Sequence, residues 1–505
     1  MTRSRSLAAR DYGAVGSAIS GMAAIAFGLV IAGLVFWEGR DHLRLQLSVL
    51  GPQPLLVDDV PYVVTGLMVA LMLMVAGFFA WVLKTGGLDR PALGILALAM
   101  VADAVPSLTQ IAIFLVLIIL IRRVYRDGDV PSPLTPVAVP LLLIVVSYAT
   151  TLLLTDQWMA IMPTFLFRMT SNIFLVVLLP ALLRTRRQIE VFFHMLLVCA
   201  CISVMVEWLQ WVVSAMAGMP VTFNTGSYNK VTTPWGIFPR LTGLMYHPNL
   251  QSNCISTIAV LTLWFGLRPR GTLSVSRRVL YLTAYVWLSL GVVFTFSRSG
   301  WLSLAIATAV VPIVRYPRFA PVYLTICGLL GAAAYETGLL KAAYDLVEGL
   351  NEASADFRWH IDYLAIDAFA NHPWIGIGTM GILDYANPWK LQVHDTYLQI
   401  ASEMGLLGIV AFGSIAALVL ARLMWTLMHS KFAFDRDWVL GLMLASVVAL
   451  IQNSFVMFLW VRFLWLMIPL AECIHLASRD QTGREPDDLP FLPPERPALA
   501  VARTS

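Results

Sequence analysis

Residues 190–217 read EVFFHMLLVCACISVMVEWLQWVVSAMA and are apolar almost throughout. A helix needs about 20 such residues to cross the roughly 30 Å hydrocarbon core of a bilayer. Similar runs recur along the whole chain, of which 59% is hydrophobic and only 13% is charged. Soluble domains carry about 25% charged residues, so a soluble globular protein is excluded. Because backbone groups in lipid must pair within their own segment, the sequence predicts an all-α polytopic membrane protein.

We expect about fourteen transmembrane helices in one helical domain over residues 1–477. They are expected at 13–37, 61–83, 91–105, 107–121, 136–154, 164–183, 190–217, 248–267, 279–296, 299–314, 319–338, 396–421, 438–457 and 460–477. The apolar segment 13–37 follows three arginines, as in a signal peptide, but it is too long for one. We therefore expect it to be retained as the first span. The third and fourth are short, and they form either a tight hairpin or one long kinked helix.

The distribution of Lys and Arg decides between these two topologies, since both residues prefer cytoplasmic loops. With a hairpin, every alternate loop is basic, as at 122–126, 184–187 and 268–278. One kinked helix would instead put Lys84 and Arg122 on opposite sides of the membrane. The hairpin is therefore favoured, and with it both termini are expected in the cytoplasm.

Three long polar segments are then expected on the outer side, at 38–60, 218–247 and 338–395. The last is the largest, and its helical periodicity predicts one or two helices on the outer surface. The proline-rich tail, 478–505, is expected to be disordered and cytoplasmic. The five cysteines all fall within apolar runs, which is typical of small buried residues rather than of disulfides or metal ligands.

Two arginines lie where cations are not expected. Arg240 belongs to an outward loop, and Arg298 stands between two apolar runs with almost no loop around it. An arginine so close to hydrocarbon requires a partner or a polar cavity. Guanidinium groups bind phosphate oxygens in bidentate fashion, which favours an anionic lipid-linked substrate at the membrane edge. The alternatives are a solvated Arg240, and an Arg298 that snorkels to the interface or pairs with Glu207.

Two histidines face the same side in this topology. His247 precedes Pro248 and Asn249 at the start of a span, where Asn249 is either the helix N-cap or a substrate contact. His394 opens the span at 396–421. The positive end of the helix favours a neutral imidazole, which is the form that a general base requires.

The remaining motifs of the outer segment are less informative. GIGTMG at 376–381 matches a dinucleotide-binding pattern, but no strand–turn–helix unit surrounds it, so this interpretation is rejected. Arg358 either pairs with Asp362 or joins a phosphate site. Glu403 follows His394 by nine residues and is not expected to orient it. Gly405 and Gly408 have the spacing of a close helix contact.

These motifs together resemble the superfamily of O-antigen ligases and of O-antigen and exopolysaccharide polymerases from bacterial envelopes. The resemblance covers about 238–410. It rests on Arg240-x-Thr-Gly with His247-Pro-Asn, Ser297-Arg298, Arg358 followed by His372-Pro-Trp-x-Gly-x-Gly, and His394 with Glu403-x-Gly-x-x-Gly. It implies a GT-C type membrane glycosyltransferase of the bacterial inner membrane that uses neither metal nor cofactor, with its active site on the periplasmic side.

By this likeness, Arg240 and His394 are the catalytic residues. The arginines bind and stabilise a leaving pyrophosphate, and His394 deprotonates an acceptor hydroxyl. Arg298, His247, Asn249 and Arg358 are the expected substrate-binding residues. Asp395 departs from the family, which often has Asn there, and its carboxylate is expected to raise the pKa of His394.

The resemblance further implies an undecaprenyl-pyrophosphate-linked glycan as donor, a sugar hydroxyl as acceptor, membrane lipid around the helices, and no nucleic acid. A flippase and a chain-length regulator are candidate partners. The Arg-x-Thr-Gly and His-Pro-Asn motifs favour a polymerase acting on lipid-linked repeats over a ligase acting on lipid A-core. A transporter or flippase for lipid-linked glycans is the rival class, but it would need ionisable groups near the bilayer midplane.

Overall fold

The computed structural model describes residues 73, 77, 89–102, 106–127, 137–153, 158–217, 230–233, 236–269, 272–338, 341, 352–385, 387, 391–455 and 462–479. The expected span 13–37, the outer segment 38–60 and nearly all of the span 61–83 lie outside these residues. The predicted start of the tail at residue 478 is too early, because Ser478 and Arg479 still belong to a helix. The rest of the tail lies outside the described residues.

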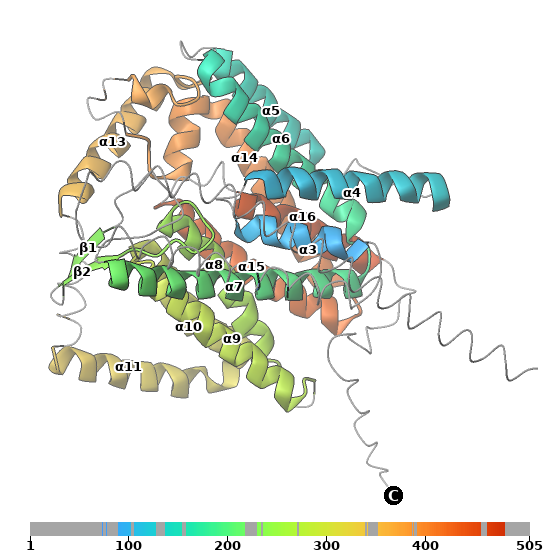
Figure 1. The fold of residues 1–505 in the computed structure, drawn as a ribbon, viewed down its shortest axis with the longest axis vertical. Coiled ribbons are helices and arrows are strands. Elements are labelled where there is room, and N and C mark those ends of the chain that lie inside the picture. The colour runs from blue at the N-terminus through green and yellow to red at the C-terminus, as the bar shows by residue number, and fades with distance from the viewer. Residues whose placement is uncertain are drawn as a thin grey trace, which may run out of the picture.

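The fold is a bundle of helices (Figure 1). The longer helices of the described chain are α3 (Asp89–Val101), α4 (Pro106–Asp127), α5 (Ala138–Leu153), α6 (Trp158–Leu182), α7 (Arg186–Ala217), α8 (Pro248–Gly266), α9 (Val275–Phe294), α10 (Arg298–Arg315), α11 (Ala320–Glu336), α13 (Glu352–Asn371), α14 (Thr396–His429), α15 (Ala433–Asn453) and α16 (Arg462–Arg479). Two short 3₁₀ turns are η1 (Pro317–Phe319) and η2 (Gly381–Leu383).

Each expected span from 91–105 onward coincides with one of these helices. The α3 and α4 helices are separate and pack against each other, as the hairpin topology requires. Within the described residues, four helical segments are long and apolar enough to cross a membrane, namely Arg186–Val212, Val275–Phe294, Pro317–Glu336 and Thr396–His429. The protein is thus a helical membrane protein, and the total of fourteen spans stays a prediction.

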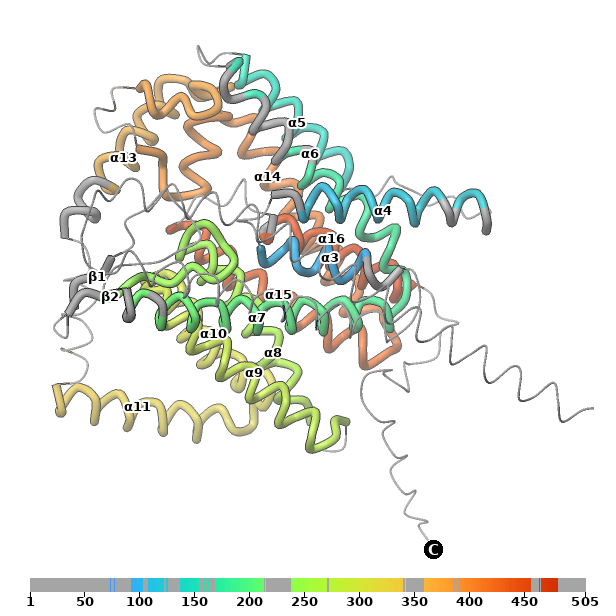
Figure 2. The backbone as a smooth tube through the Cα atoms, in the orientation of Figure 1, coloured from blue at the N-terminus to red at the C-terminus, as the bar shows by residue number. Residues whose placement is uncertain are grey.

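Two features of the fold differ from the expectations. The all-α class is interrupted by a small antiparallel hairpin of β1 (Lys230–Thr233) and β2 (Gly236–Pro239), which the β-branched residues of β1 favour. The expectation that every cysteine is buried is also wrong, because Cys327 lies on α11, none of whose residues is buried. Figure 2 shows α11 running along the edge of the molecule, away from the other helices. An apolar helix so placed has its side chains free to face lipid.

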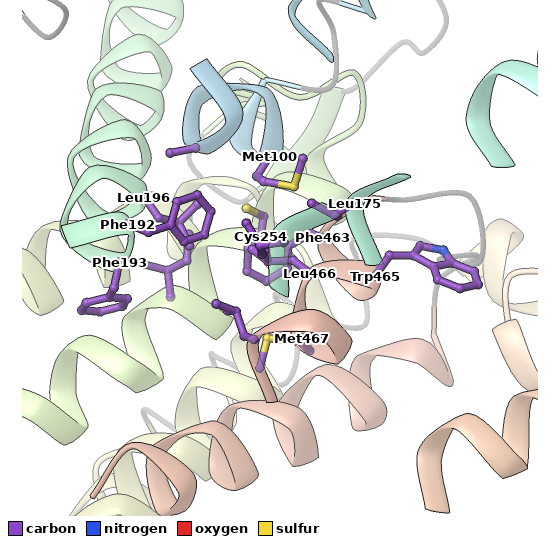
Figure 3. Packing of buried hydrophobic residues seen from close by; sticks show 14 of the residues in the cluster. Met100, Leu175, Phe192, Phe193, Leu196, Cys254, Phe463, Trp465, Leu466 and Met467 are labelled. Atoms are coloured by element: carbon purple, nitrogen blue, oxygen red, sulfur yellow. The ribbon is translucent and has the colours of Figure 1, made fainter. Parts of the chain in front are cut away.

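The α8 helix forms the centre of the bundle, and all of its residues are buried. Figure 3 shows Cys254 of α8 among Met100 of α3, Phe192 of α7 and Leu466 of α16. Two of its polar side chains are hydrogen-bonded to neighbouring helices: Gln251 donates to Glu207 of α7 at 2.7 Å, and Ser256 accepts from Gln452 of α15 at 2.7 Å. Such interhelical hydrogen bonds satisfy polar groups that lipid cannot.

One end of this central group of helices is fixed by ion pairs. Asp437 of α15 accepts from Arg268, which follows α8, at 2.7 Å, and it also pairs with Arg315 at the end of α10. Its neighbour Asp435 binds Arg186 of α7 at 2.7 Å, and both side chains are buried. We call Asp435, Asp437 and their arginines the ion-pair cluster. Breaking such a buried pair leaves an uncompensated charge, so the cluster fixes the relative positions of these helices.

The α8, α10 and α15 helices all run from the ion-pair cluster to the opposite end of the bundle. At a rise of about 1.5 Å per residue, the 19 residues of α8 span roughly 28 Å. This length is close to the roughly 30 Å of a bilayer core. At the far end, the three helices bring together Asn249 of α8, Arg298 of α10 and Ser454, which directly follows α15.

The α14 helix is broken at Gly405, whose φ of 63° and ψ of −157° are accessible almost only to glycine. The segment 373–378 satisfies the backbone groups freed by the break. Ile377 donates to the Ser402 carbonyl at 2.9 Å, and Leu406 donates to the Pro373 carbonyl at 2.7 Å. The spacing of Gly405 and Gly408 predicts only a close helix contact. The structure shows in addition that α14 is broken at Gly405.

We expect Gly405→Ala to destabilise the protein by about 1–3 kcal/mol, because alanine is strained in this conformation. A Cβ atom there would also lie 2.6 Å from the Trp374 carbonyl carbon. The measurement is the midpoint of thermal unfolding of the purified protein in detergent. Gly413→Ala on the same helix is the matched control, since a Cβ atom at Gly413 meets nothing within 4 Å. Equal midpoints for the two variants would contradict the expectation.

Candidate active site

A cavity of about 450 Å³ opens at the end of the bundle opposite the ion-pair cluster. This volume is within the range of about 300–1,000 Å³ that small-ligand pockets occupy. Its walls come from the segment before α8, the α9–α10 junction, α13, and the adjoining ends of α14 and α15. Because Arg240, Arg298 and Arg358 all line it, we call it the arginine cavity.

Arg240 is held rigidly between two helices by uncharged partners. Its Nε donates to the Thr295 carbonyl at 3.1 Å, and a terminal nitrogen donates to Asn249 Oδ1 at 2.7 Å. Burial lowers the pKa of Arg240 to about 10, and the positive charges of Arg358 and Arg298 add to this effect. The guanidinium remains charged at neutral pH, and none of the described carboxylates forms an ion pair with it, so an anionic ligand is favoured beside it.

Arg298 is the first residue of α10, and it reaches the cavity through an unusual backbone turn. Phe296, two residues earlier, has a φ of 49°, in the left-handed region that bulky residues rarely adopt. The predicted alternative of pairing with Glu207 is wrong, because that carboxylate accepts from Gln251 instead. Among the described residues, Arg298 has no hydrogen-bond or ion-pair partner.

Arg358 belongs to α13, within the surface segment that the sequence predicts to be helical. Burial is the main reason why its pKa is lowered; the charge of Arg298 adds to this, and that of Asp362 opposes it. No ion pair within 4 Å joins Arg358 to Asp362 or to any other described residue. The cavity thus gathers three cations that repel one another, an arrangement that a bound polyanion would relieve.

His394 lies on the wall of the same cavity, directly before α14. Its Nδ1 lies 2.9 Å from the Gln392 carbonyl. A carbonyl only accepts, so Nδ1 carries the proton and Nε2 keeps a free lone pair. The pKa of His394 is lowered, first by burial and then by the charge of Arg358. The imidazole is therefore neutral at pH 7, with Nε2 available to accept a proton.

The expectation that Asp395 raises the pKa of His394 is wrong: this pKa is lowered, and Asp395 is not among the causes of the shift. The Asp395 carboxylate caps α14 by accepting from the backbone of Tyr397 at 2.7 Å and of Leu398 at 2.9 Å. These bonds commit the carboxylate to the helix, and burial together with Arg358 determines the protonation of His394. Asp395 does act on Asp362, whose pKa is raised to about 6 by burial first and then by Asp395, against the opposing charge of Arg358.

The N-cap of α8 is His247, and not Asn249 as one sequence interpretation has it. Pro248 lacks an N–H and is suited to the first helical position, so the cap falls on the residue before it. His247 Nδ1 accepts from the Asn249 backbone at 3.1 Å, and burial is the first cause that lowers the pKa of His247 to about 3. Asn249 lines the cavity and holds Arg240, whereas His247 is not part of the lining.

The motif Gly376–Gly381 has a structural role and no dinucleotide-binding geometry. A Cβ atom at Gly376 would lie 2.4 Å from the Glu403 carbonyl carbon, so this loop and α14 pack backbone to backbone at the helix break. Glu403 is buried there and accepts weakly from Gln399, at 3.4 Å and 3.5 Å. It does not line the arginine cavity, in agreement with the expectation that it does not orient His394.

Sequence reasoning missed several residues of the cavity wall. Trp359 and Asp362 are the neighbours of Arg358 on α13, and the four-residue spacing of Arg358 and Asp362 could have placed both on one helix face. Ser454 and Phe455 follow α15, and nothing in the sequence connects them with the cavity. The apolar part of the wall consists of Phe296, Leu302, Trp359 and Phe455.

The chemistry available here follows from these groups. Three arginines can bind a group with several negative charges, such as a diphosphate. A neutral histidine beside them can accept a proton from a hydroxyl. Fixed cations are most effective where negative charge develops in a transition state, because they need no reorganisation during the reaction.

Residues 283–413 match the family model described as O-Antigen ligase. The matched segment contains Arg298, Arg358 and His394, and it ends within α14. Arg240, His247 and Asn249 precede it. No curated protein matches the chain. The superfamily resemblance based on the sequence motifs is thus confirmed by residues 283–413, where the chain is similar to the O-antigen ligase family.

Proposed function

We propose that the protein is a glycosyltransferase that polymerises undecaprenyl-pyrophosphate-linked oligosaccharide repeats into a surface polysaccharide. The observation that carries this proposal is the convergence of Arg240, Arg298, Arg358 and His394 on one cavity. The proposal agrees with the ligase-like activity that the family match indicates. A polyprenyl diphosphate is the anion that a membrane protein with such a cavity would meet at the bilayer surface.

In the proposed reaction, a hydroxyl of the acceptor sugar attacks the anomeric carbon of the donor sugar. A new C–O bond forms as the bond between the anomeric carbon and the diphosphate oxygen breaks. The bonding electrons pass to the diphosphate, whose growing charge Arg240, Arg298 and Arg358 stabilise. The hydroxyl proton passes to Nε2 of His394, which acts as general base. No metal ion is required, because the arginines supply the positive charge.

The reaction takes place on the outer face of the inner membrane in this proposal. The arginines Arg186, Arg268 and Arg315 of the ion-pair cluster lie at the end of the bundle away from the cavity. Basic residues favour the cytoplasmic side, which supports a periplasmic cavity end. The basic loops of the sequence support cytoplasmic termini in the same way. Since the polar groups of the cavity lie at one end of the helices, this arrangement favours an enzyme over a transporter.

The second candidate is an O-antigen ligase, which the description of the matched family favours. It would use the same donor and the same four residues, but it would transfer the glycan to lipid A-core. The polymerase is placed first because of the Arg240-x-Thr-Gly and His247-Pro-Asn motifs.

The test is glycan analysis in a strain that lacks this protein, with and without the wild-type gene. Accumulation of single lipid-linked repeats without long chains supports the polymerase. Long chains that remain on the carrier and never reach lipid A support the ligase. Unaltered glycans on both carriers would refute both activities. The purified protein is then expected to transfer glycan at an unchanged rate in excess EDTA, and loss of the rate would refute metal independence.

The pH dependence of transfer follows from the protonation of His394. Its pKa is lowered from the ordinary value of 6.5, and protonation removes the base. We therefore expect kcat/KM to fall on the acidic side with a midpoint below pH 6.5. Arg358→Gln removes a charge that lowers this pKa, so the midpoint should move to higher pH. A midpoint that is the same in wild type and in Arg358→Gln would contradict the assignment of His394.

A further inference from the structure

Among the described residues that line the arginine cavity, one is acidic, Asp362 of α13. Oδ1 of its carboxyl is buried and has no hydrogen-bond partner among the described residues. A carboxylate repels a diphosphate, so Asp362 is out of place in a cavity that serves only to bind one. It is also not committed to Arg358, because no ion pair within 4 Å joins the two side chains.

Unpartnered carboxylate oxygens are strong acceptors for hydroxyl groups, with short O–H···O⁻ hydrogen bonds. Neutral sugars present several hydroxyls and no charge, so they can contact Asp362 without competing for the arginines. A buried acceptor atom without a hydrogen-bond partner costs free energy. A ligand hydroxyl that donates to Asp362 removes this cost, so the site favours a ligand with a hydroxyl at this place.

Trp359 adds an apolar surface next to this acceptor. It lines the cavity from the same helix as Asp362, and its side chain is 74% exposed. An indole ring is a rigid, flat surface that can cover the C–H face of a sugar ring, and an exposed tryptophan loses water from its surface when it does so. The serines Ser297, Ser299 and Ser454 supply further hydroxyl groups on the facing wall.

The lining residues of the cavity therefore form two chemically distinct groups. Arg240 and Arg298 of the helical bundle and Arg358 of α13 are cationic, and we call them the arginine wall; Trp359 and Asp362 of α13 offer an aromatic surface and an acceptor, and we call them the α13 wall. His394 lines the cavity with both groups. A base that takes a proton from an acceptor hydroxyl must lie within hydrogen-bond reach of that sugar as well as near the donor.

We propose that Asp362 and Trp359 form the binding subsite for the acceptor sugar, with Asp362 accepting hydrogen bonds from its hydroxyls and Trp359 covering its apolar face. This inference rests on the proposed glycosyltransferase function and names the substrate class of one wall of the same cavity. Trp359 and Asp362 thereby select a neutral sugar, and the arginines, including Arg358 of the same helix, bind the diphosphate.

The test uses the full-length protein in lipid nanodiscs with two probes. Undecaprenyl diphosphate, the carrier without sugar, reports on the arginine wall through its dissociation constant. The carrier-free repeat oligosaccharide, released from lipid-linked repeats by mild acid, serves as acceptor and reports on the α13 wall through its KM. For Asp362→Asn we expect the KM of the oligosaccharide to rise about tenfold or more, since a hydrogen bond to a charged group is lost. Binding of the carrier should stay within about twofold of wild type.

Trp359→Ala should raise the same KM, and Trp359→Phe should restore most of the wild-type value. Asp367→Asn is the matched control: Asp367 lies on the same helix, outside the cavity, and accepts from the Tyr385 hydroxyl at 2.7 Å. An unchanged oligosaccharide KM in Asp362→Asn would overturn the subsite, and so would weakened carrier binding, which would mean that Asp362 positions Arg358. Wild-type protein that neither binds the carrier nor uses the oligosaccharide would overturn the proposed function itself.

Discussion

Replacement of His394 by alanine should reduce glycan transfer by about 10²–10⁴-fold, which is the usual contribution of a general base. The imidazole is neutral and Nδ1 is engaged with the Gln392 carbonyl. In the proposed reaction, Nε2 accepts the proton of the acceptor hydroxyl. The dissociation constant of undecaprenyl diphosphate should change little, because in the proposal the arginines, and not His394, bind its diphosphate. The measurement is kcat for transfer together with the dissociation constant of the carrier.

The matched control is His429→Ala. His429 ends α14, the helix that His394 precedes, and it is exposed and stacked on Trp425. The His429→Ala protein should transfer glycan at the wild-type rate. If His394→Ala also retained that rate, the assignment of the base would fail, and a transporter for lipid-linked glycans would again be the leading alternative.

Arg240→Lys should reduce kcat/KM by about 10²-fold or more, comparable with the loss of a donor that stabilises charge in a transition state. Lysine keeps the positive charge but lacks the planar fork of donors. It cannot bind the Thr295 carbonyl, Asn249 and a diphosphate in the geometry that Arg240 allows. The loss should appear in kcat more than in the KM of the donor, because charge on the diphosphate is greatest in the transition state.

Arg278→Lys provides the control for this variant. Arg278 also donates to a backbone carbonyl, that of Pro269 at 3.1 Å, but it is only half-buried and does not line the cavity. Wild-type kcat/KM is expected for it. An Arg240→Lys protein with the same kcat/KM would show that charge alone suffices at Arg240.

The helices of the described region could be predicted from the sequence, because apolar length and basic loops are local signals. The cavity residues could be predicted in part. Arg240 and Arg298 are conspicuous since they stand at the membrane edge where cations are unexpected, and His394 since it precedes a span. All three line one cavity. Their chemical roles stay predictions, because only kinetic measurements test them.

Other features depend on contacts between distant segments and leave no local signal. The break at Gly405 exists because the segment 373–378 supplies the missing backbone partners. The engagement of Asn249 with Arg240 requires the tertiary fold to bring them together. The protonation of His394 depends on its burial and on Arg358 of α13, and not on the neighbouring Asp395.

The ion-pair cluster has a consequence for the membrane in which the protein works. Because α8, α10 and α15 are rigidly joined at that end, their length fixes how far the arginine cavity stands from the opposite membrane surface. Hydrophobic mismatch costs a fraction of a kcal/mol per Å, and a bundle tied together in this way has little freedom to tilt its helices separately. If the cavity binds the diphosphate of a carrier lipid, as proposed, the two meet at the best height in a bilayer of matching thickness, and lipid acyl-chain length then influences substrate access.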